Sequence, residues 1–270
     1  MFFVCAAFSG DVVAAAPQRV VTLSPHLAEL TCAAGACEKL VGVAAYTDYP
    51  EAAAKLPQVA DAHGVNAEAL LALKPDLVLT WEGGTPQSAL DALAKLSVPA
   101  RALRVRRLDD IAIALEQIGE WLGTADAAKT AARDFRSGLA RLAQRYAEAS
   151  RLRVMYQIEN GPIYSVNRES PISQAINVCG GVNVFGELPQ IAAPVSREAV
   201  MAENPDVIVF ARQDNVARIL DDWSRWPELK AVRNEHLYSV NADRLARATP
   251  RMLQGIEELC GLMDMARIKR

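Results

Sequence analysis

The side chains best suited to chemistry stand just after stretches of β-branched residues and leucine that are typical of buried strands. Tyr46 follows one such stretch, and Trp81, Gly83 and Gly84 follow or end another. Aromatic rings, glycines and a few hydrogen-bonding groups favour a cleft for a large, flat, partly apolar ligand. In parallel sheets such clefts lie beyond the carboxyl ends of the strands. The candidates expected in the second half are Tyr164, Asp243, Arg244 and Arg247.

Signatures of catalysis are missing from the sequence. It contains no Gly-x-Ser-x-Gly, no His-Glu-x-x-His, no phosphate loop and no Gly-x-Gly-x-x-Gly after a strand. Only 3 histidines are present, which leaves little room for a His-rich metal site. We therefore expect a binding protein and not an enzyme, with no catalytic cofactor and no metal.

Each candidate also has a structural interpretation. Tyr46 and Tyr49 could be half-buried anchors of a loop. Asp243 and Arg247 could form a surface ion pair at a helix start, which would contribute little to stability. His26 is better suited to a loop or helix cap than to ligand binding, and these alternatives stay open at this stage.

An eleven-residue phrase occurs twice, at residues 66–76 and 196–206, offset by 130 positions and with five identities. Each copy begins with a residue able to cap a short helix and ends in Pro-Asp before a strand-like run. The repeat favours two duplicated lobes. Glu68 and Glu198 occupy the same place in the two copies, so they suit docking onto a symmetric basic surface. Stabilisation of the first helical turn explains each acid equally well.

The remaining pattern alternates strands with helices, which predicts an α/β fold with parallel sheets. Between the halves, residues 125–149 are rich in Ala, Leu and Arg and lack proline. They predict one stiff helix of roughly 24 residues, or about 36 Å. We expect an N-terminal lobe over 17–123, the linking helix over 124–150 and a second lobe over 151–270. The predicted strands span 19–24, 40–44, 76–80, 100–105, 153–158, 206–210 and 236–240, with a helix over 87–96.

Composition excludes several classes of function. The 270 residues are 51% hydrophobic and 23% charged, and their net charge of −3 argues against a nucleic-acid binder or a polybasic membrane-surface protein. Residues 1–16 are apolar and end in three alanines, as at the cleavage end of a secretory signal. Asp11 interrupts that segment and no Lys or Arg precedes Arg19, so a disordered tail of a cytosolic protein is the alternative.

Four cysteines follow the N-terminal segment: Cys32, Cys37, Cys179 and Cys260. Without a Cys-x-x-Cys spacing or clustered histidines, they do not suggest zinc. In an exported protein they suggest two disulfides, and Cys32 is close enough to Cys37 to clip a helix end. In a cytosolic protein they would be four buried thiols.

From about Arg19 to Met263 the chain resembles the helical-backbone class (class III) of periplasmic substrate-binding proteins of ABC importers, which bind cobalamin, haem and ferric siderophores. Single phrases are shared across the class, whereas their order and spacing along the chain are specific. The phrases are Thr22-Leu23-Ser24-Pro25, Tyr46-x-Asp48-Tyr49-Pro50, Leu73-Lys74-Pro75-Asp76, Trp81-x-Gly83-Gly84, Val178-Cys179-Gly180-Gly181, Val195-Ser196-Arg197-Glu198 and Arg247-Ala248-x-Pro250-Arg251.

The resemblance implies a fold and a function. The fold is two Rossmann-like lobes joined by one long rigid helix. The function is capture of cobalamin or a related corrinoid between the lobes, with haem or a ferric siderophore as the alternative, and delivery to an ABC permease dimer in the inner membrane. We expect a periplasmic monomer that does not bind nucleic acid.

The resemblance also implies roles for single residues. Tyr46 and the segment 243–247 would contact the corrinoid, while Trp81 and Tyr164 would wall the cleft. The two acids of the repeat would engage arginines of the permease, and Cys179 would pair with Cys260. The chain departs from the pattern at Ala62 and at Ala192 or its neighbour, where tryptophans are expected, and at Arg244, where an aromatic residue is expected. Haem is the main competitor, because Tyr46 or His26 could ligate iron.

Overall fold

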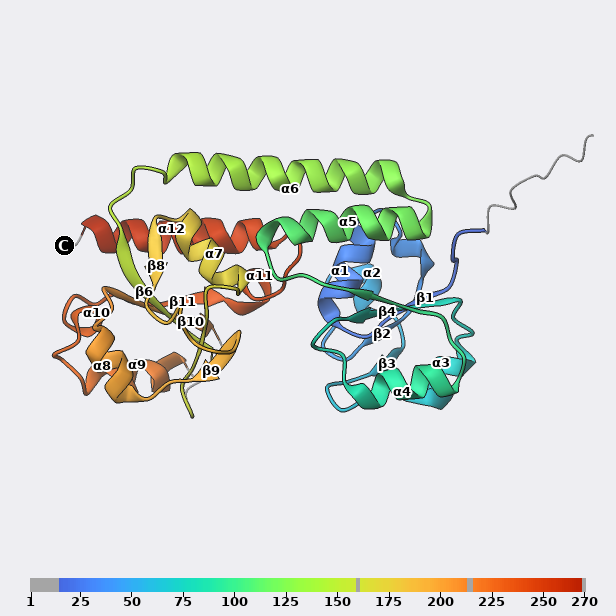
Figure 1. Ribbon diagram of the computed structural model, residues 1–270, viewed down its shortest axis with the longest axis horizontal. Coiled ribbons are helices and arrows are strands. Elements are labelled where there is room, and N and C mark those ends of the chain that lie inside the picture. Colours follow the sequence, from blue (N-terminus) through green and yellow to red (C-terminus); the bar gives the residue numbers. More distant parts are fainter. Residues whose placement is uncertain (1–14, 159–160, 213–215, 269–270) are drawn as a thin grey trace, which may run out of the picture.

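The computed structural model describes residues 15–158, 161–212 and 216–268. They form two α/β lobes that hang from a shared layer of helices (Figure 1). Among these residues no helix is both long enough and apolar enough to span a bilayer. Nearly all of the predicted signal segment, residues 1–16, lies outside the described ranges.

The first lobe is built on a five-stranded sheet in the order β3-β2-β1-β4-β5, with every neighbouring pair parallel. The order reverses direction between β1 and β4, as in Rossmann-like sheets, and ligands of such sheets bind outside that point. The central strands are buried runs of Val and Leu, as expected for a sheet covered on both faces. The strands are β1 (Val20–Thr22), β2 (Leu40–Ala44), β3 (Gln58–Ala60), β4 (Leu77–Trp81) and β5 (Ala100–Leu103).

The second lobe has a four-stranded parallel sheet in the order β11-β10-β6-β8 and a separate antiparallel pair, β7 with β9. Figure 1 places β9 on the side of this lobe that faces the first lobe. The strands are β6 (Leu152–Gln157), β7 (Tyr164–Val166), β8 (Gly181–Asn183), β9 (Ala192–Pro194), β10 (Val207–Arg212) and β11 (Leu237–Asn241).

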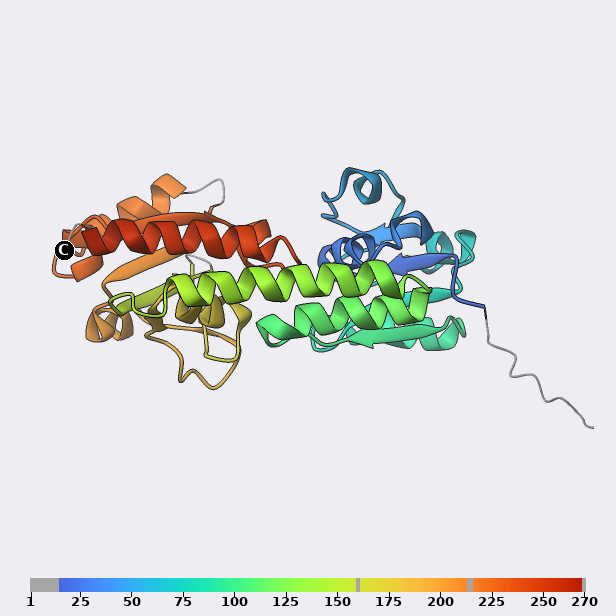
Figure 2. The same cartoon turned by 90° about the horizontal axis from the view of Figure 1, so that it is seen from above.

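Three helices make the layer that joins the lobes: α5 (Leu108–Leu122), α6 (Ala125–Arg145) and α12 (Met252–Ile268). In Figures 1 and 2, α6 runs across both lobes, while α5 lies beside it over the first lobe and α12 over the second. The predicted long helix is confirmed, but it ends at Arg145 and not at residue 149. The chain turns through residues 146–149 so that it can enter β6.

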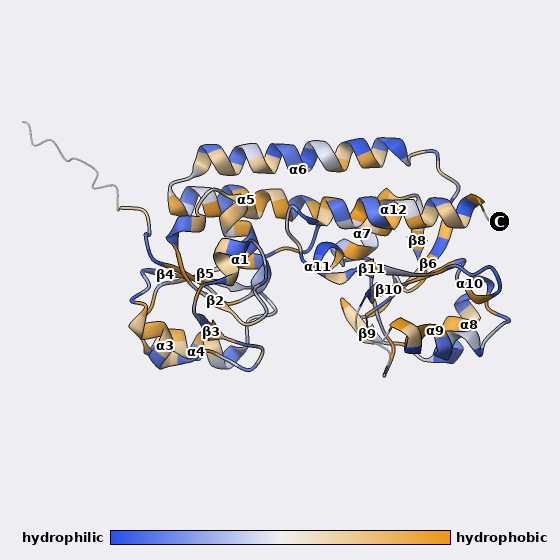
Figure 3. Ribbon diagram, turned by 180° about the vertical axis from the view of Figure 1, so that it is seen from behind, coloured by the Kyte–Doolittle hydropathy of each residue, from blue (hydrophilic) through white to orange (hydrophobic). Residues whose placement is uncertain are grey.

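The layer is packed as tightly as a domain interior. On α6 the buried residues recur every three or four positions, from Ala128 through Phe135 to Leu142. Gly119 of α5 permits close contact, since a Cβ there would lie 2.3 Å from the Ala128 Cβ. One cluster of buried hydrophobic residues continues from the first lobe through these helices into the second. In Figure 3, α5 is richer in hydrophobic residues than α6, which covers it from outside.

Shorter helices cover the sheets. The helical periodicity predicted over 87–96 corresponds to α4, which ends one residue earlier. The helices are α1 (Pro25–Ala33), η1 (Cys37–Lys39), α2 (Glu51–Ala54), α3 (Ala67–Ala72), α4 (Gln87–Lys95), α7 (Pro171–Val178), α8 (Arg197–Glu203), α9 (Val216–Ser224), α10 (Lys230–Arg233) and α11 (Ala242–Leu245).

The repeated phrase forms the same local structure in both lobes. The side chain of Asn66 accepts a hydrogen bond from the backbone N–H of Ala69 at the start of α3, and Ser196 accepts one from Ala199 at the start of α8. Each helix is followed by a central parallel strand, β4 or β10. The prediction of two related lobes is confirmed by this correspondence.

Both expected disulfides are present. Cys32, near the end of α1, pairs with Cys37 at the start of η1. Cys179, which follows α7, pairs with Cys260 in α12 and ties the second lobe to the helical layer. The alternative of four free thiols is therefore wrong.

Candidate functional site

A cavity of about 230 Å³ lies between the lobes, and we call it the cleft cavity. The first lobe contributes residues at the carboxyl ends of β1, β4 and β5, on either side of the point where the sheet order reverses. The second lobe contributes the segment that follows β11 and α11. The lining residues are His26, Trp81, Val105, Ala246, Arg247 and Ala248.

Trp81 is presented to this cavity by a tight turn. The backbone N–H groups of Gly84 and Thr85 donate to the Trp81 carbonyl, and the Thr85 hydroxyl accepts from the Trp81 N–H. Gly84 lies directly against the indole, because a Cβ there would be 2.0 Å from a ring carbon. Gly83 has φ +83°, which glycine adopts without strain. Trp81 as a whole is 40% exposed, which leaves part of it available to a ligand.

His26 packs edge-on against Trp81, with 4.9 Å between the ring centroids. A hydrogen bond of 3.0 Å joins its Nδ1 to the Ser24 hydroxyl. Burial, together with the positive charge of Arg247, lowers the pKa of His26 to about 4. The imidazole is therefore neutral at physiological pH. The interpretation of His26 as only a cap or loop residue is incomplete, because the side chain lines the cleft cavity.

Tyr46 is held in an unusual and exposed position just beyond β2. Its side chain is 82% exposed and its backbone has φ +63°, a conformation that is rare for a bulky residue. The half-buried anchor considered for Tyr46 is therefore wrong. Tyr49 better fits that description: it is 45% exposed, and the Arg251 guanidinium lies 4.0 Å from its ring centroid.

Arg247 links the two lobes through a network of ion pairs. Its guanidinium contacts the carboxylates of Glu29 at 3.0 Å, Asp243 at 2.8 Å, and Asp48. It also donates to the Tyr46 carbonyl at 3.3 Å. The Asp243–Arg247 pair is thus part of a larger cluster and not an isolated surface pair. Since the Arg247 side chain is only 17% exposed, its main contacts are within the protein.

Glu29 is the centre of this network and was not predicted as a site residue. Its side chain is 2% exposed. Its carboxylate accepts hydrogen bonds from Arg247, Thr249 and Arg251, which lie in the segment between α11 and α12. A buried acid requires partners, but those of Glu29 lie so far along the chain that no local sequence pattern indicates them. These contacts fix the loop before α12 against the first lobe.

Of the predicted ligand residues, Trp81 and Arg247 line the cleft cavity, whereas Tyr46, Gly83, Gly84, Tyr164, Asp243 and Arg244 are not among its lining residues. Tyr164 is half-buried in β7 and not in a loop after β6, as the sequence suggested. Arg244 is exposed in α11, and its backbone N–H donates to the Asn241 side chain. Neither lines the cavity. Ala62 and Ala192, where tryptophans were expected, are both exposed.

Glu68 and Glu198 are exposed in the first turns of α3 and α8. Figure 1 shows these helices on opposite lobes, both on the side of the molecule away from α6. Hydrogen bonds from its own backbone N–H and from the Ser196 side chain lower the pKa of Glu198, so that carboxylate is ionised at neutral pH.

Within the described ranges, no three His, Cys, Asp or Glu side chains are grouped so that they could hold a metal ion. The site is thus a cleft with an aromatic wall, built from strand ends of two lobes on a rigid support. This architecture is that of a two-lobed solute-binding protein. Residues 20–243 match the periplasmic binding protein family, and the chain belongs to this family.

Individual proteins of this kind are similar to the chain over nearly its whole length. The chain is 36% identical over 267 residues to the vitamin B12-binding protein of Vibrio parahaemolyticus, covering 97% of this chain and 96% of that protein. It matches the crystal structure of the periplasmic vitamin B12 binding protein of Vibrio cholerae with a TM-score of 0.84 and 34% identity, over 93% and 98% of the two chains. A periplasmic haem binding protein from Pseudomonas aeruginosa matches with a TM-score of 0.78 and 27% identity, over 91% and 92%.

Proposed function

We propose that this protein captures a corrinoid, vitamin B12 or a close relative, between its lobes and delivers it to an ABC importer. The observation that carries the proposal is the cleft cavity, which both lobes build at strand ends around Trp81. Relatives named for vitamin B12 binding, alike over nearly the whole chain, support the same ligand class. The expected compartment is the periplasm and the expected state is a monomer.

Stacking on exposed aromatic rings would supply most of the binding energy. Trp81 lies at the first lobe's strand ends, and the 82% exposed Tyr46 stands beside the same gap on a loop held by Arg247. Arg247 acts as a positioning residue for that loop, while Asp243, Arg244, Tyr164, Gly83 and Gly84 remain proposed contacts or supports. A conjugated macrocycle with an amide periphery suits rings and a few polar groups.

The direct test is titration of the purified protein with cyanocobalamin, followed by calorimetry and tryptophan fluorescence. We expect micromolar or tighter binding by the wild type. Trp81→Ala should weaken binding about tenfold or more, because a stacked ring contributes both buried area and ring contact. Trp121→Phe, on the far end of α5, is the matched control and should bind normally. A wild type that does not bind cyanocobalamin at micromolar concentration would contradict the proposal.

Haem is the second candidate ligand. The neutral imidazole of His26 lines the cleft cavity, and a haem binding protein is among the similar structures. Titration with haemin would then give a Soret band that His26→Ala or Tyr46→Ala abolishes. A band that persists in both variants would show iron ligation elsewhere or nonspecific association.

We further propose that Glu68 and Glu198 dock the protein onto a permease dimer. Their equivalent positions on α3 and α8, and their exposure, support this role. Reversing both charges to Lys should abolish corrinoid uptake by cells and leave corrinoid affinity intact. Glu148→Lys, at an exposed acid just beyond α6, is the control. A fall in affinity in the double variant would place the two acids in the cleft instead.

A further inference from the structure

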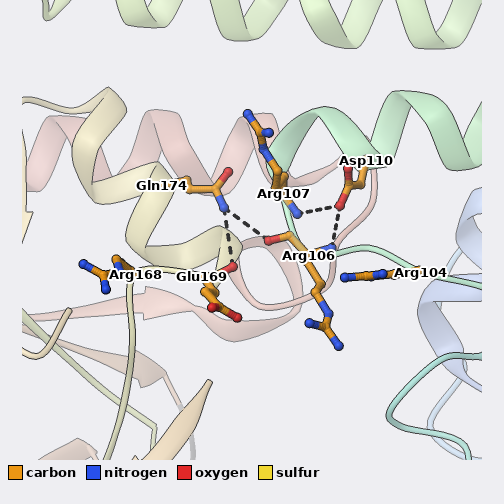
Figure 4. A pocket seen from close by; sticks show the side chains of 7 residues that line it. All are labelled: Arg104, Arg106, Arg107, Asp110, Arg168, Glu169 and Gln174. Atoms are coloured by element: carbon orange, nitrogen blue, oxygen red, sulfur yellow. Dashed lines mark hydrogen bonds between the residues drawn. The ribbon is translucent and has the colours of Figure 1, made fainter. Parts of the chain in front are cut away.

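A second and larger cavity, of about 780 Å³, also lies between the lobes, and we call it the arginine pocket. Figure 4 shows its lining residues, which come from the connection between β5 and α5, from the connection between β7 and α7, and from the first turns of both helices; Arg106 and Arg107 point to opposite sides of their segment. Neither connection carries a residue that sequence reasoning assigned to the site. The lining residues are Arg104, Arg106, Arg107, Asp110, Arg168, Glu169 and Gln174.

The two cavities share a wall. Val105 lines the cleft cavity, while its neighbours Arg104 and Arg106 line the arginine pocket. Consecutive Cα atoms are about 3.8 Å apart, so a single thickness of chain separates the two spaces. The arginine pocket therefore adjoins the cleft cavity, close enough for peripheral groups of a large ligand in the cleft to approach it.

The backbone of this wall is fixed from both lobes. Gln174 of α7 accepts a hydrogen bond from the Leu108 N–H at 3.0 Å and donates one to the Arg106 carbonyl at 3.2 Å. The Asp110 carboxylate accepts from the N–H groups of Arg106 and Arg107, each at 2.8 Å (Figure 4). These contacts use backbone groups, so they hold the loop and leave both guanidinium groups available.

Positive charge is in excess among the residues that line the pocket, which include four arginines and only two acids, Asp110 and Glu169. Arg104 is 3.7 Å from Glu82, and Arg168 pairs with Glu187, an acid outside the lining. Within the described part of the chain, the side chains of Arg106 and Arg107 make no ion pair. The amino end of the 15-residue helix α5 adds to the positive potential.

We propose that the arginine pocket binds an oxyanion carried on the periphery of a corrinoid that lies in the cleft cavity. The inference rests on the proposed function and extends it to ligand selectivity. A guanidinium group donates two parallel hydrogen bonds to a carboxylate or a phosphodiester, and several such groups around one cavity favour an anionic substituent over a neutral amide. The ligand's oxyanion is either the phosphodiester of the nucleotide loop or a side-chain carboxylate.

The test compares three probes. Cyanocobalamin carries the phosphodiester, dicyanocobinamide lacks it, and cobyrinic acid lacks it but bears carboxylates. The double variant Arg106→Gln/Arg107→Gln should bind one of the two oxyanion-bearing probes about tenfold more weakly than the wild type does, with dicyanocobinamide unchanged. The probe that loses affinity identifies the source of the oxyanion. Raising the salt concentration should lower the affinity for that probe in the wild type but not in the double variant.

Arg141→Gln, at an exposed arginine of α6, is the control for a general loss of positive charge. Urea denaturation of all variants checks that they are folded. Equal affinities of wild type and double variant for all three probes would overturn the inference, and so would an equal loss for all three. Failure of the wild type to bind any corrinoid would instead overturn the proposed function, and this inference with it.

Discussion

At the scale of single residues, the position of Trp81 depends on the absence of a side chain three residues later. The indole lies over Gly84 so closely that no other residue type fits beneath it. The Trp-x-Gly-Gly phrase could thus be recognised as a site from the sequence. The reason for its second glycine is packing against the ring and not backbone conformation, which only the structure shows.

Gly84→Ala should displace the indole, because the new Cβ would lie 2.0 Å from a ring carbon. We expect corrinoid affinity to fall about tenfold, as for other losses of a well-placed aromatic contact, while unfolding free energy changes by less than about 1 kcal/mol. Fluorescence emission and titration measure the two effects. Gly261→Ala, where no atom lies within 4 Å of a new Cβ, should retain the affinity. Normal corrinoid affinity in Gly84→Ala would show that the position of Trp81 does not depend on a glycine at residue 84.

The neutral His26 makes stability depend on pH. Its pKa is about 4 in the folded protein and close to 6.5 when unfolded. Between these values the unfolded chain binds a proton that the folded chain does not, so the free energy of unfolding rises with pH from 4 to 6.5 and then levels off. The full effect is at most about 3 kcal/mol.

Urea denaturation between pH 4.5 and 7.5 measures this slope. In His26→Gln the contribution should disappear, because glutamine does not titrate, and the remaining slope belongs to other groups. An identical slope in wild type and variant would show that folding does not lower the pKa of His26.

The aromatic candidate residues could be predicted from the sequence, because aromatic residues and glycines directly after a strand seldom serve the packing of the core. Glu29 could not be recognised as a site residue from the sequence, because its partners lie more than two hundred positions away and no local pattern indicates them. The arginines among residues 104–107 likewise could not be assigned to a pocket from the sequence, because residues of the second lobe form the other part of its lining.

At the scale of elements, prediction succeeded where strands are long enough to show a run of buried β-branched residues. β2, β4 and β10 lie within one or two residues of the predicted bounds. Four strands of three residues each, β3, β7, β8 and β9, were missed because three residues carry little periodicity; β1 is equally short but was predicted, as part of a longer strand over 19–24.

The two disulfides should differ in their effect on stability. Cys179 and Cys260 are 81 positions apart, and Cys32 and Cys37 only 5. A longer closed loop restricts the unfolded chain more, so Cys179→Ala/Cys260→Ala should cost about 4 kcal/mol and Cys32→Ala/Cys37→Ala about 2 kcal/mol. Urea denaturation of the two double variants provides the comparison, and equal losses would contradict it.

At the scale of the whole molecule, the lobes are joined by more than the one helix that the sequence indicated. α5 and α12 complete the layer, and α12 comes from the far end of the described chain (Figure 2). The uninterrupted run of residues 125–149 revealed α6, but nothing local shows that two other helices pack beside it. The domain bounds at 17–123, 124–150 and 151–270 remain a prediction.

The contact of Glu29 with Arg247 and Arg251 should contribute strongly to this assembly. Glu29→Gln removes the carboxylate that neutralises two largely buried guanidinium groups, so we expect a loss of about 3 kcal/mol in unfolding free energy. Glu116→Gln removes the acid of a more exposed ion pair with Arg136 and should cost no more than about 1 kcal/mol. Urea denaturation distinguishes the two, and similar losses would count against a special role of Glu29.

The shared helical layer has a further consequence for transport kinetics. Such a layer would keep the separation of α3 and α8 nearly the same whether or not a ligand lies between the lobes. A permease that recognised Glu68 and Glu198 would meet the same pair of carboxylates on empty and on loaded molecules, and it could favour the loaded form only by as much as their binding energies differ. Empty carriers would then compete for the importer, so the rate of uptake would pass through a maximum as carrier concentration rises above that of the ligand.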